Sequence, residues 1–227
     1  MLRNRLAVLR FETNHLPERF GLFLIIALGE SVVQVGHVAA STGPLSPERL
    51  VATVAAYALV CSLWWVYFVF AARAVRYALA EARVHTDVIR PVFSYGHLLF
   101  ICGIVAVAVG LAEVVREPEA RLPASLAALL VGGCCLYLAT FGYTRWRMFR
   151  AVSWTRLSAA LACTVAYPVA AYASGLAGLL VLVLVTVALN VTEAVIVRRR
   201  ERAGQEVEAG EVVEAAEPEP EGVTITD

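Results

Sequence analysis

The sequence predicts an all-α, polytopic membrane protein with six transmembrane helices and both termini in the cytoplasm. Apolar residues make up 59% of the 227 residues and charged residues 17%, and the mean hydropathy is +0.71. Soluble domains are about 45–50% apolar and about 25% charged. Apolar runs of about 20 residues, the length that crosses a hydrocarbon core of about 30 Å as a helix, recur along the chain. The basic residues are distributed unevenly between the ends of these runs.

Turn and helix-start residues delimit the runs. The first ends at the Ser41-Thr42-Gly43-Pro44 turn, and the Ser46-Pro47 pair supplies an N-cap and a first-turn proline for the second. Pro168 lies inside the fifth run, where it predicts a kink because proline lacks a backbone N–H. We expect spans at about 20–40, 49–72, 92–112, 123–143, 157–174 and 178–197.

The arginines indicate how the spans are oriented. All 19 basic residues are Arg, and sixteen of them lie at alternate ends of the spans, in residues 1–19, 73–90, 145–156 and 198–202. The intervening ends share only Arg49, Arg116 and Arg121. By the positive-inside rule, the arginine-rich ends are cytoplasmic. The pattern predicts a multi-pass protein of the inner membrane.

The two terminal segments differ from the spans in composition. Residues 1–19 contain no long apolar stretch, so we expect a cytoplasmic flank and no signal peptide. Residues 203–227 carry eight carboxylates and no basic residue. Such a composition buries too little apolar surface to offset the loss of chain entropy. We therefore expect residues 198–227 to form a disordered acidic tail in the cytoplasm.

Polar residues lie along one face of the first span. Glu30, Gln34 and His37 fall within about 40° of one another on a helix, and Arg19 follows the same line. A carboxylate near the bilayer centre costs at least about 2.5 kcal/mol, so this face is expected to meet protein or water. The opposite face has no polar residue and is expected to meet lipid; it consists of Gly21, Ile25, Leu28, Val32, Val35 and Ala39.

The sixth span repeats the spacing with Thr186, Asn190 and Glu193. Glu193 lies close to the three arginines at residues 198–200, so an ion pair with them at the membrane interface is the favoured interpretation. Asn190 lies deeper in the span. A path for a proton, ion or small solute is one hypothesis for these polar residues, and hydrogen bonding between helices is the other. The candidate path residues are Arg19, Glu30, Gln34, His37, Asn190 and Glu193.

The sequence contains no nucleophile–base arrangement, glycine-rich phosphate loop or metal-ligand motif. We therefore expect no enzymatic activity, no metal and no cofactor. All five cysteines lie in apolar runs and are expected to act as small apolar residues. His97, on an otherwise apolar face, is expected to be a hydrogen-bonded core residue. The expected partners are the lipid bilayer and either further copies of the chain or a second membrane half, with no nucleic acid.

The run from His15 to Ser31, which reads HLPERFGLFLIIALGES, closely resembles the signature of the bacterial low temperature requirement A (LtrA) family. A second stretch, YGHL at residues 95–98 followed by GIV at 103–105 and AVGL at 108–111, is similar to another part of that family. Family members often carry Glu directly after this last Leu, whereas here Ala112 intervenes and Glu113 follows. The resemblance covers roughly residues 12–197.

This resemblance implies a polytopic inner-membrane protein associated with growth in the cold, and it matches the carboxy-terminal part of such proteins. Family members usually begin with another helical half that bears a Glu-Leu-Phe-Phe-Asp-Leu motif, which does not occur in this sequence. We therefore expect a truncated or split member. Two functions stay open: transport with Glu30 as the binding or protonation site, and a non-transporting role in cold or envelope-stress adaptation in which Glu30 and Gln34 hold helices together.

Overall fold

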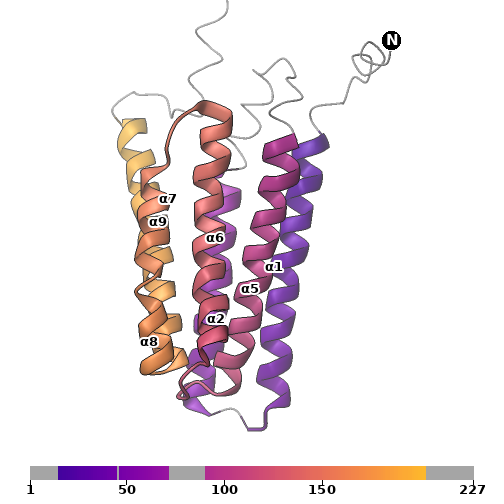
Figure 1. The fold of residues 1–227 in the computed structure, drawn as a ribbon, viewed down its shortest axis with the longest axis vertical. Helices are drawn as coiled ribbons and strands as arrows, with labels where there is room; N and C mark the ends of the chain where they lie inside the picture. The colour runs from indigo at the N-terminus through magenta and orange to yellow at the C-terminus, as the bar shows by residue number, and fades with distance from the viewer. Residues whose placement is uncertain (1–14, 45, 72–89, 203–227) are drawn as a thin grey trace, which may run out of the picture.

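The computed structural model describes residues 15–44, 46–71 and 90–202, and these residues contain helices and no strand (Figure 1). Two of the α-helices adjoin a short π-helix, one at its carboxyl end and the other at its amino end. The elements in chain order are α1 (His15–Ser41), α2 (Pro47–Trp65), η2 (Val66–Ala71), η3 (Arg90–Gly96), α5 (His97–Arg116), α6 (Ala124–Phe149), α7 (Trp154–Cys163), α8 (Ala166–Tyr172) and α9 (Gly175–Arg202). The all-α prediction is confirmed for this part of the chain.

The helices run up and down around a common core (Figure 1). Going around the bundle, α1 packs on α2, α2 on α9, α9 on α7 and α8, these two on α6, α6 on α5, and α5 on α1. Large buried side chains from across the bundle fill the centre, including Leu24, Leu59, Ile104, Tyr137 and Leu182. The core is therefore closed by side chains of the bundle itself.

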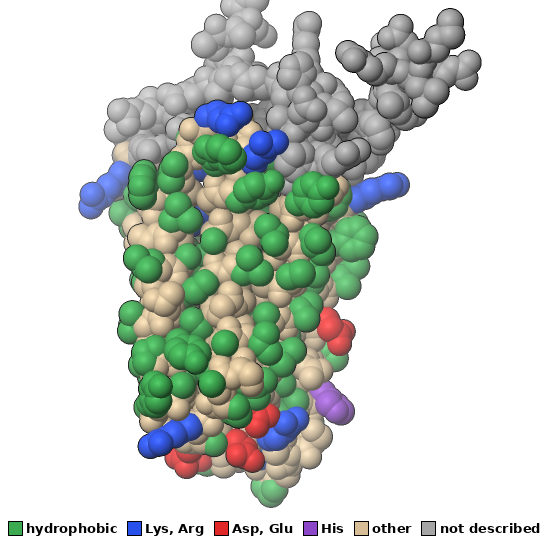
Figure 2. Space-filling model, in the orientation of Figure 1, with side chains coloured by type: hydrophobic (Ala, Val, Ile, Leu, Met, Phe, Trp, Pro, Cys, Tyr) green, Lys and Arg blue, Asp and Glu red, His purple; other side chains and the backbone are tan. Residues whose placement is uncertain are grey.

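Within the described part of the chain, five helices are long and apolar enough to cross a membrane by length and composition. They are Arg19–Ser41, Pro47–Val69, Ser94–Arg116, Ala124–Met148 and Gly175–Arg199. Figure 2 shows a broad band dominated by apolar side chains, with most of the basic and acidic groups at the two ends of the molecule. This distribution is the one that a bilayer requires of the surface that contacts it.

The fifth expected span is divided into two short helices, α7 and α8, which lie end to end along α6 and α9 (Figure 1). The break falls at Thr164 and Val165, directly before α8. Pro168 has no N–H to donate to the carbonyl of Thr164, four residues earlier, and that carbonyl accepts instead from Tyr167 N–H at 3.1 Å. The predicted kink at Pro168 is therefore an interruption of the helix.

Small residues bring α5 and α6 close together. A Cβ placed on Gly133 would lie 2.7 Å from the carbonyl oxygen of Gly103, and one on Gly110 would lie 2.5 Å from Cβ of Leu130. Neither position has room for a larger side chain without a shift of the helices. Close backbone approach at small residues is a common way to pack helices in a membrane.

The arginine-rich ends of the described helices gather at one end of the bundle. The carboxyl end of α6, the start of α7 and the carboxyl end of α9 lie together at the top of Figure 1, where Figure 2 shows basic side chains. Arg49, Arg116 and Arg121 belong to the opposite end. The bundle topology thus reproduces the alternation seen in the sequence.

Several segment predictions lie outside the described residues. These are most of the amino-terminal flank, most of the connector at 73–90 and the acidic segment at 203–227. At the edges of these segments, α1 begins at His15 and α9 continues to Arg202. Residues 15–19 and 198–202 are therefore helical, although the sequence assigned them to the flank and the tail.

Candidate functional site

The polar row of α1 lies on the outer surface of the bundle. Arg19, Glu30, Gln34 and His37 are all exposed, and Figure 2 shows acidic and histidine side chains on the flank that α1 forms. No side-chain hydrogen bond or ion pair between described residues involves Glu30, Gln34 or His37. Glu30 lies eleven residues from each end of the span Arg19–Ser41, about 16 Å along the helix axis from either end. The row therefore places hydrogen-bonding groups on the outer surface of the bundle, with Glu30 at the middle of the candidate span.

The side of α1 that packs into the core is not the polar face, which the sequence pattern led us to expect against protein or water. Leu24, Leu28, Ser31 and Val35 are buried, and the Ser31 hydroxyl donates to the carbonyl of Ala27 at 3.0 Å. The interpretation of Gly21, Leu28, Val35 and Ala39 as lipid-facing is therefore wrong, and of that predicted face only Ile25 and Val32 are exposed. The pattern of one polar and one apolar face missed this third side, because an apolar residue suits a protein core as well as it suits lipid.

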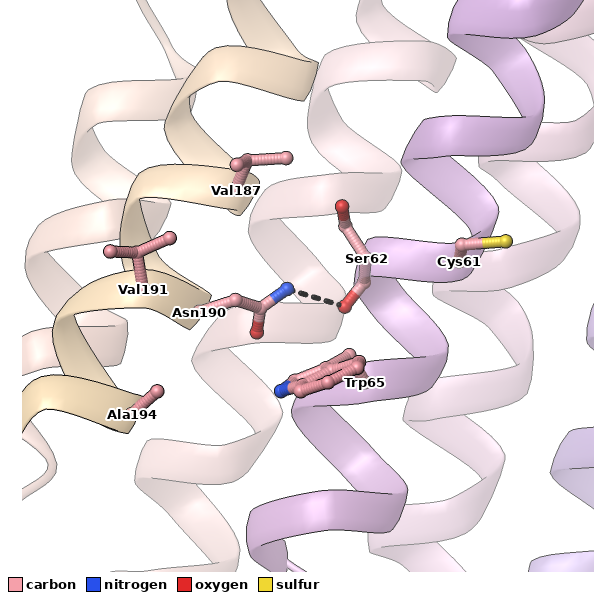
Figure 3. A pocket seen from close by; sticks show the side chains of 7 residues that line it. All are labelled: Cys61, Ser62, Trp65, Val187, Asn190, Val191 and Ala194. Atoms are coloured by element: carbon pink, nitrogen blue, oxygen red, sulfur yellow. Dashed lines mark hydrogen bonds between the residues drawn. The ribbon is translucent and has the colours of Figure 1, made fainter. Parts of the chain in front are cut away.

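The polar residues of α9 face α2 and α7. Asn190 donates from Nδ2 to the carbonyl oxygen of Ser62 at 3.1 Å, while its buried Oδ1 accepts no hydrogen bond from the described residues. Figure 3 shows this contact in a pocket of about 290 Å³ between α2 and α9. The pocket is lined by Cys61, Ser62, Trp65, Val187, Asn190, Val191 and Ala194. Thr186 is buried, and its hydroxyl donates to carbonyls of its own helix.

Glu193 has a different partner from the one predicted. It is 9% exposed and accepts from Arg156 on α7, with Nε to Oε1 at 2.8 Å and Nη2 to Oε2 at 3.1 Å. Thr155 Oγ1 donates to the same carboxylate at 3.2 Å, and the Arg156 guanidinium lies 4.5 Å from the centre of the Phe141 ring. The predicted pair with residues 198–200 is wrong because a bidentate partner from another helix lies within reach. Sequence proximity along α9 gave no indication of it.

The structure does not bring the two polar sets together. α1 packs against α2 and α5, whereas α9 packs against α2, α7 and α8, and Figure 1 places α1 and α9 on opposite flanks. Glu30 and Glu193 thus belong to separate environments, one exposed and one buried in an ion pair. The described residues provide no path that runs through both.

A buried histidine–tyrosine pair lies where the two π-helices meet the core. Tyr67 in η2 and His97 at the start of α5 are 5% and 3% exposed, and the Tyr67 hydroxyl lies 2.8 Å from His97 Nε2. His97 Nδ1 lies 3.3 Å from the carbonyl oxygen of Val92, which only accepts, so Nδ1 carries the proton and Nε2 accepts from Tyr67. The Phe20 ring centre is 4.7 Å from that of His97.

This geometry confirms the prediction of a hydrogen-bonded core histidine. The π-helices themselves were not predicted, although the aromatic run at residues 64–68 and Pro91 close to Gly96 mark the places where they occur. The described residues contain no group of three or more His, Cys, Asp or Glu side chains placed to hold a metal ion. Cys134 and Cys163 are buried thiols of the core.

Comparisons with known proteins identify the family. The model of the bacterial low temperature requirement A protein (LtrA) family matches residues 1–191, which is most of the chain. An uncharacterised protein of Rhizobium meliloti (strain 1021) is 29% identical over 131 residues, which cover 58% of this chain. The match spans about a third, 32%, of the length of that relative. No solved structure matches. The chain therefore belongs to the bacterial low temperature requirement A family.

Proposed function

We propose that this protein is a multi-pass subunit of an inner-membrane transporter or channel, and that the polar row of α1 forms one wall of its path for a proton, ion or small solute. Glu30 is the binding or protonation site of that path. The observation that carries the proposal is that Glu30, Gln34 and His37 are exposed within a candidate membrane span. The same helix packs against the rest of the bundle through a different face. A second protein surface supplies the opposite wall.

The cost of the exposed carboxylate supports this proposal. A Glu at the bilayer centre that faces lipid costs at least about 2.5 kcal/mol, and intramembrane carboxylates usually face protein or a water-filled cavity. Glu193, another acidic residue of the spans, faces protein, where Arg156 pairs with it. Since no helix of the described bundle covers Glu30, protein or water outside this bundle is needed to solvate it.

In the proposed topology, α7 and α8 together make the fifth of six crossings, in addition to the five long helices. They comprise residues 154–172, about 28 Å at 1.5 Å per residue, which approaches the thickness of the hydrocarbon core. Discontinuous helices are common in transporters. With six crossings, both termini lie on the side of the arginine-rich ends, the cytoplasm.

The alternative is a non-transporting membrane protein that supports cold or envelope-stress adaptation. In that case Glu30 and Gln34 hold a neighbouring protein by hydrogen bonds, with no water in the contact. The exposure of both residues is compatible with this role as well. Water access to the row distinguishes the two functions.

The test is thiol labelling in membranes. In a background without the five native cysteines, Gln34→Cys is treated with a small, water-soluble, membrane-impermeant thiol reagent. Val32→Cys, exposed on the opposite face of the same helix, is the matched control. The proposal predicts rapid reaction at position 34 and none at position 32. Failure of position 34 to react would contradict a water-filled path and favour the alternative, and equal reaction at both positions would contradict the membrane placement.

A further inference from the structure

The exposed polar row of α1 continues as a regular helix seam. Its members follow one another by alternating steps of four and three residues: Phe23, Ala27, Glu30, Gln34, His37 and Ser41. Ala27 is half-buried, and the other five are exposed. A strict 3–4 alternation keeps a row facing the same neighbouring helix over several turns, as in coiled coils. The seam therefore has the spacing of a surface that packs along another helix.

The chemistry of the seam suits a second copy of itself. Glu30 presents carboxylate acceptors, and Gln34 presents amide donors one turn further along. In a two-fold dimer every contact occurs twice, so Glu30 of one copy meets Gln34 of the other and the reverse. Because the arginine distribution fixes one orientation in the membrane, the two α1 helices of such a dimer are parallel and equivalent residues lie at the same depth. Gln34 of each copy then lies one turn, about 6 Å along the axis, from Glu30 of the other, a separation that the two long side chains can bridge.

The exposed surface of α9 differs in this respect. On α9, the exposed residues include Leu180, Leu184 and Val191, and the exposed Thr192 hydroxyl donates to the carbonyl of Ala188 in its own helix. These four side chains are either apolar or already hydrogen-bonded, so this surface is suited to contact with lipid. Of these two surfaces, the seam on α1 is therefore the one for which a protein partner is needed.

We propose that a second copy of this chain packs in parallel against the α1 seam, with reciprocal hydrogen bonds between Glu30 and Gln34 across a two-fold axis. The inference rests on the proposed function in one respect: it identifies the surface that completes the path along α1, and in that path water reaches the hydrogen-bonded Glu30 and Gln34 side chains. Polar residues at seam positions are known to fix the register of paired helices. Here they fix which residues of the two copies meet.

Cross-linking in membranes tests this arrangement. His37→Cys and Ser41→Cys, on the seam, and Ile25→Cys and Val32→Cys, exposed on the opposite face, are each made in the cysteine-free chain and treated with a short bifunctional thiol reagent. We expect covalent dimers at positions 37 and 41 and none at 25 and 32. Absence of dimers at the seam, or equal yields on both faces, would overturn the inference.

An exchange of the two polar residues makes the test specific. In the Ser41→Cys chain, Gln34→Leu removes two hydrogen bonds per dimer, and at the modest strength of such bonds in membranes we expect about tenfold weaker association. The double exchange Glu30→Gln with Gln34→Glu keeps a reciprocal pair and should restore cross-linking. An exchange that cross-links no better than Gln34→Leu would show that the pair does not form.

The two proposals fail separately. Loss of seam cross-linking together with retained labelling at position 34 would leave the water-filled path and reject the second copy as its partner, in favour of a different protein. Seam cross-linking together with an unreactive position 34 would retain the dimer and reject the path.

Discussion

Arg156 and Glu193 form a bidentate ion pair that joins α7 to α9, with 12% of the Arg156 side chain and 11% of the Glu193 side chain exposed. The pair anchors the start of the interrupted helix to the last helix of the bundle. Phe141 beneath the guanidinium adds α6 to the same contact. Three elements therefore meet at one charged pair near the arginine-rich end.

We expect Glu193→Gln and Arg156→Gln each to lower the free energy of unfolding by about 3 kcal/mol, because each leaves a buried charge unpaired. The double variant should lose less than the sum of the two. Thermal unfolding in detergent measures the effect. The control is Glu113→Gln, which breaks the exposed Glu113–Arg116 pair within α5 and should cost less than about 0.5 kcal/mol. Equal effects at Glu193 and Glu113 would show that burial of the pair does not matter.

The close contact between α5 and α6 predicts a sharp difference between adjacent glycines. In Gly133→Ala the new Cβ would meet the backbone of Gly103 and Val107 within 3 Å, so the helices must separate, at a cost of about 1–3 kcal/mol. In Gly132→Ala the Cβ meets nothing within 4 Å, and stability should stay the same or rise slightly. Thermal unfolding of the two variants checks this, and equal stability would mean that the helices are not in close contact.

The Tyr67–His97 hydrogen bond predicts a cost for removing one hydroxyl. Tyr67→Phe removes the hydrogen bond between the Tyr67 hydroxyl and the buried His97 Nε2, so we expect a loss of about 1–3 kcal/mol in unfolding free energy. Tyr95→Phe, at an exposed position, is the control and should be nearly neutral. A neutral Tyr67→Phe variant would indicate that another group, such as water, satisfies His97.

The arginine asymmetry predicts the topology. Reporter fusions after Ser41, Glu119 and Gly175 should report the periplasm, and fusions after Arg83, Arg150 and Arg202 should report the cytoplasm. The fusion after Gly175 tests the α7–α8 crossing in particular. If Gly175 and Arg150 report the same side, α7 and α8 do not cross the membrane.

The sequence predicted the helices better than it predicted their contacts. Apolar run lengths, prolines and arginines located the long helices and the break near Pro168, because these features act locally or through the membrane itself. The partner of Glu193 and the buried side of α1 depend on which helices pack together. Arg156 is 37 residues from Glu193, and no local periodicity records that contact.

The same limit applies to the candidate site. The sequence correctly grouped Glu30, Gln34 and His37 on one face, since helix geometry alone determines that grouping. It did not indicate that Asn190 and Glu193 lie on the opposite flank of the bundle, because that requires the packing order of the helices.

The most direct test of the central claim, that Glu30 is the binding or protonation site of a transport path, is rescue of growth in the cold in a strain that lacks this protein. Glu30→Gln keeps volume and hydrogen bonding but removes the titrating group, whereas Glu30→Leu removes both. With membrane abundance measured for each variant, we predict that Glu30→Gln reaches wild-type abundance and, like Glu30→Leu, fails to restore growth. Restored growth with Glu30→Gln at normal abundance would contradict the claim and leave Glu30 as a hydrogen-bonding contact between helices.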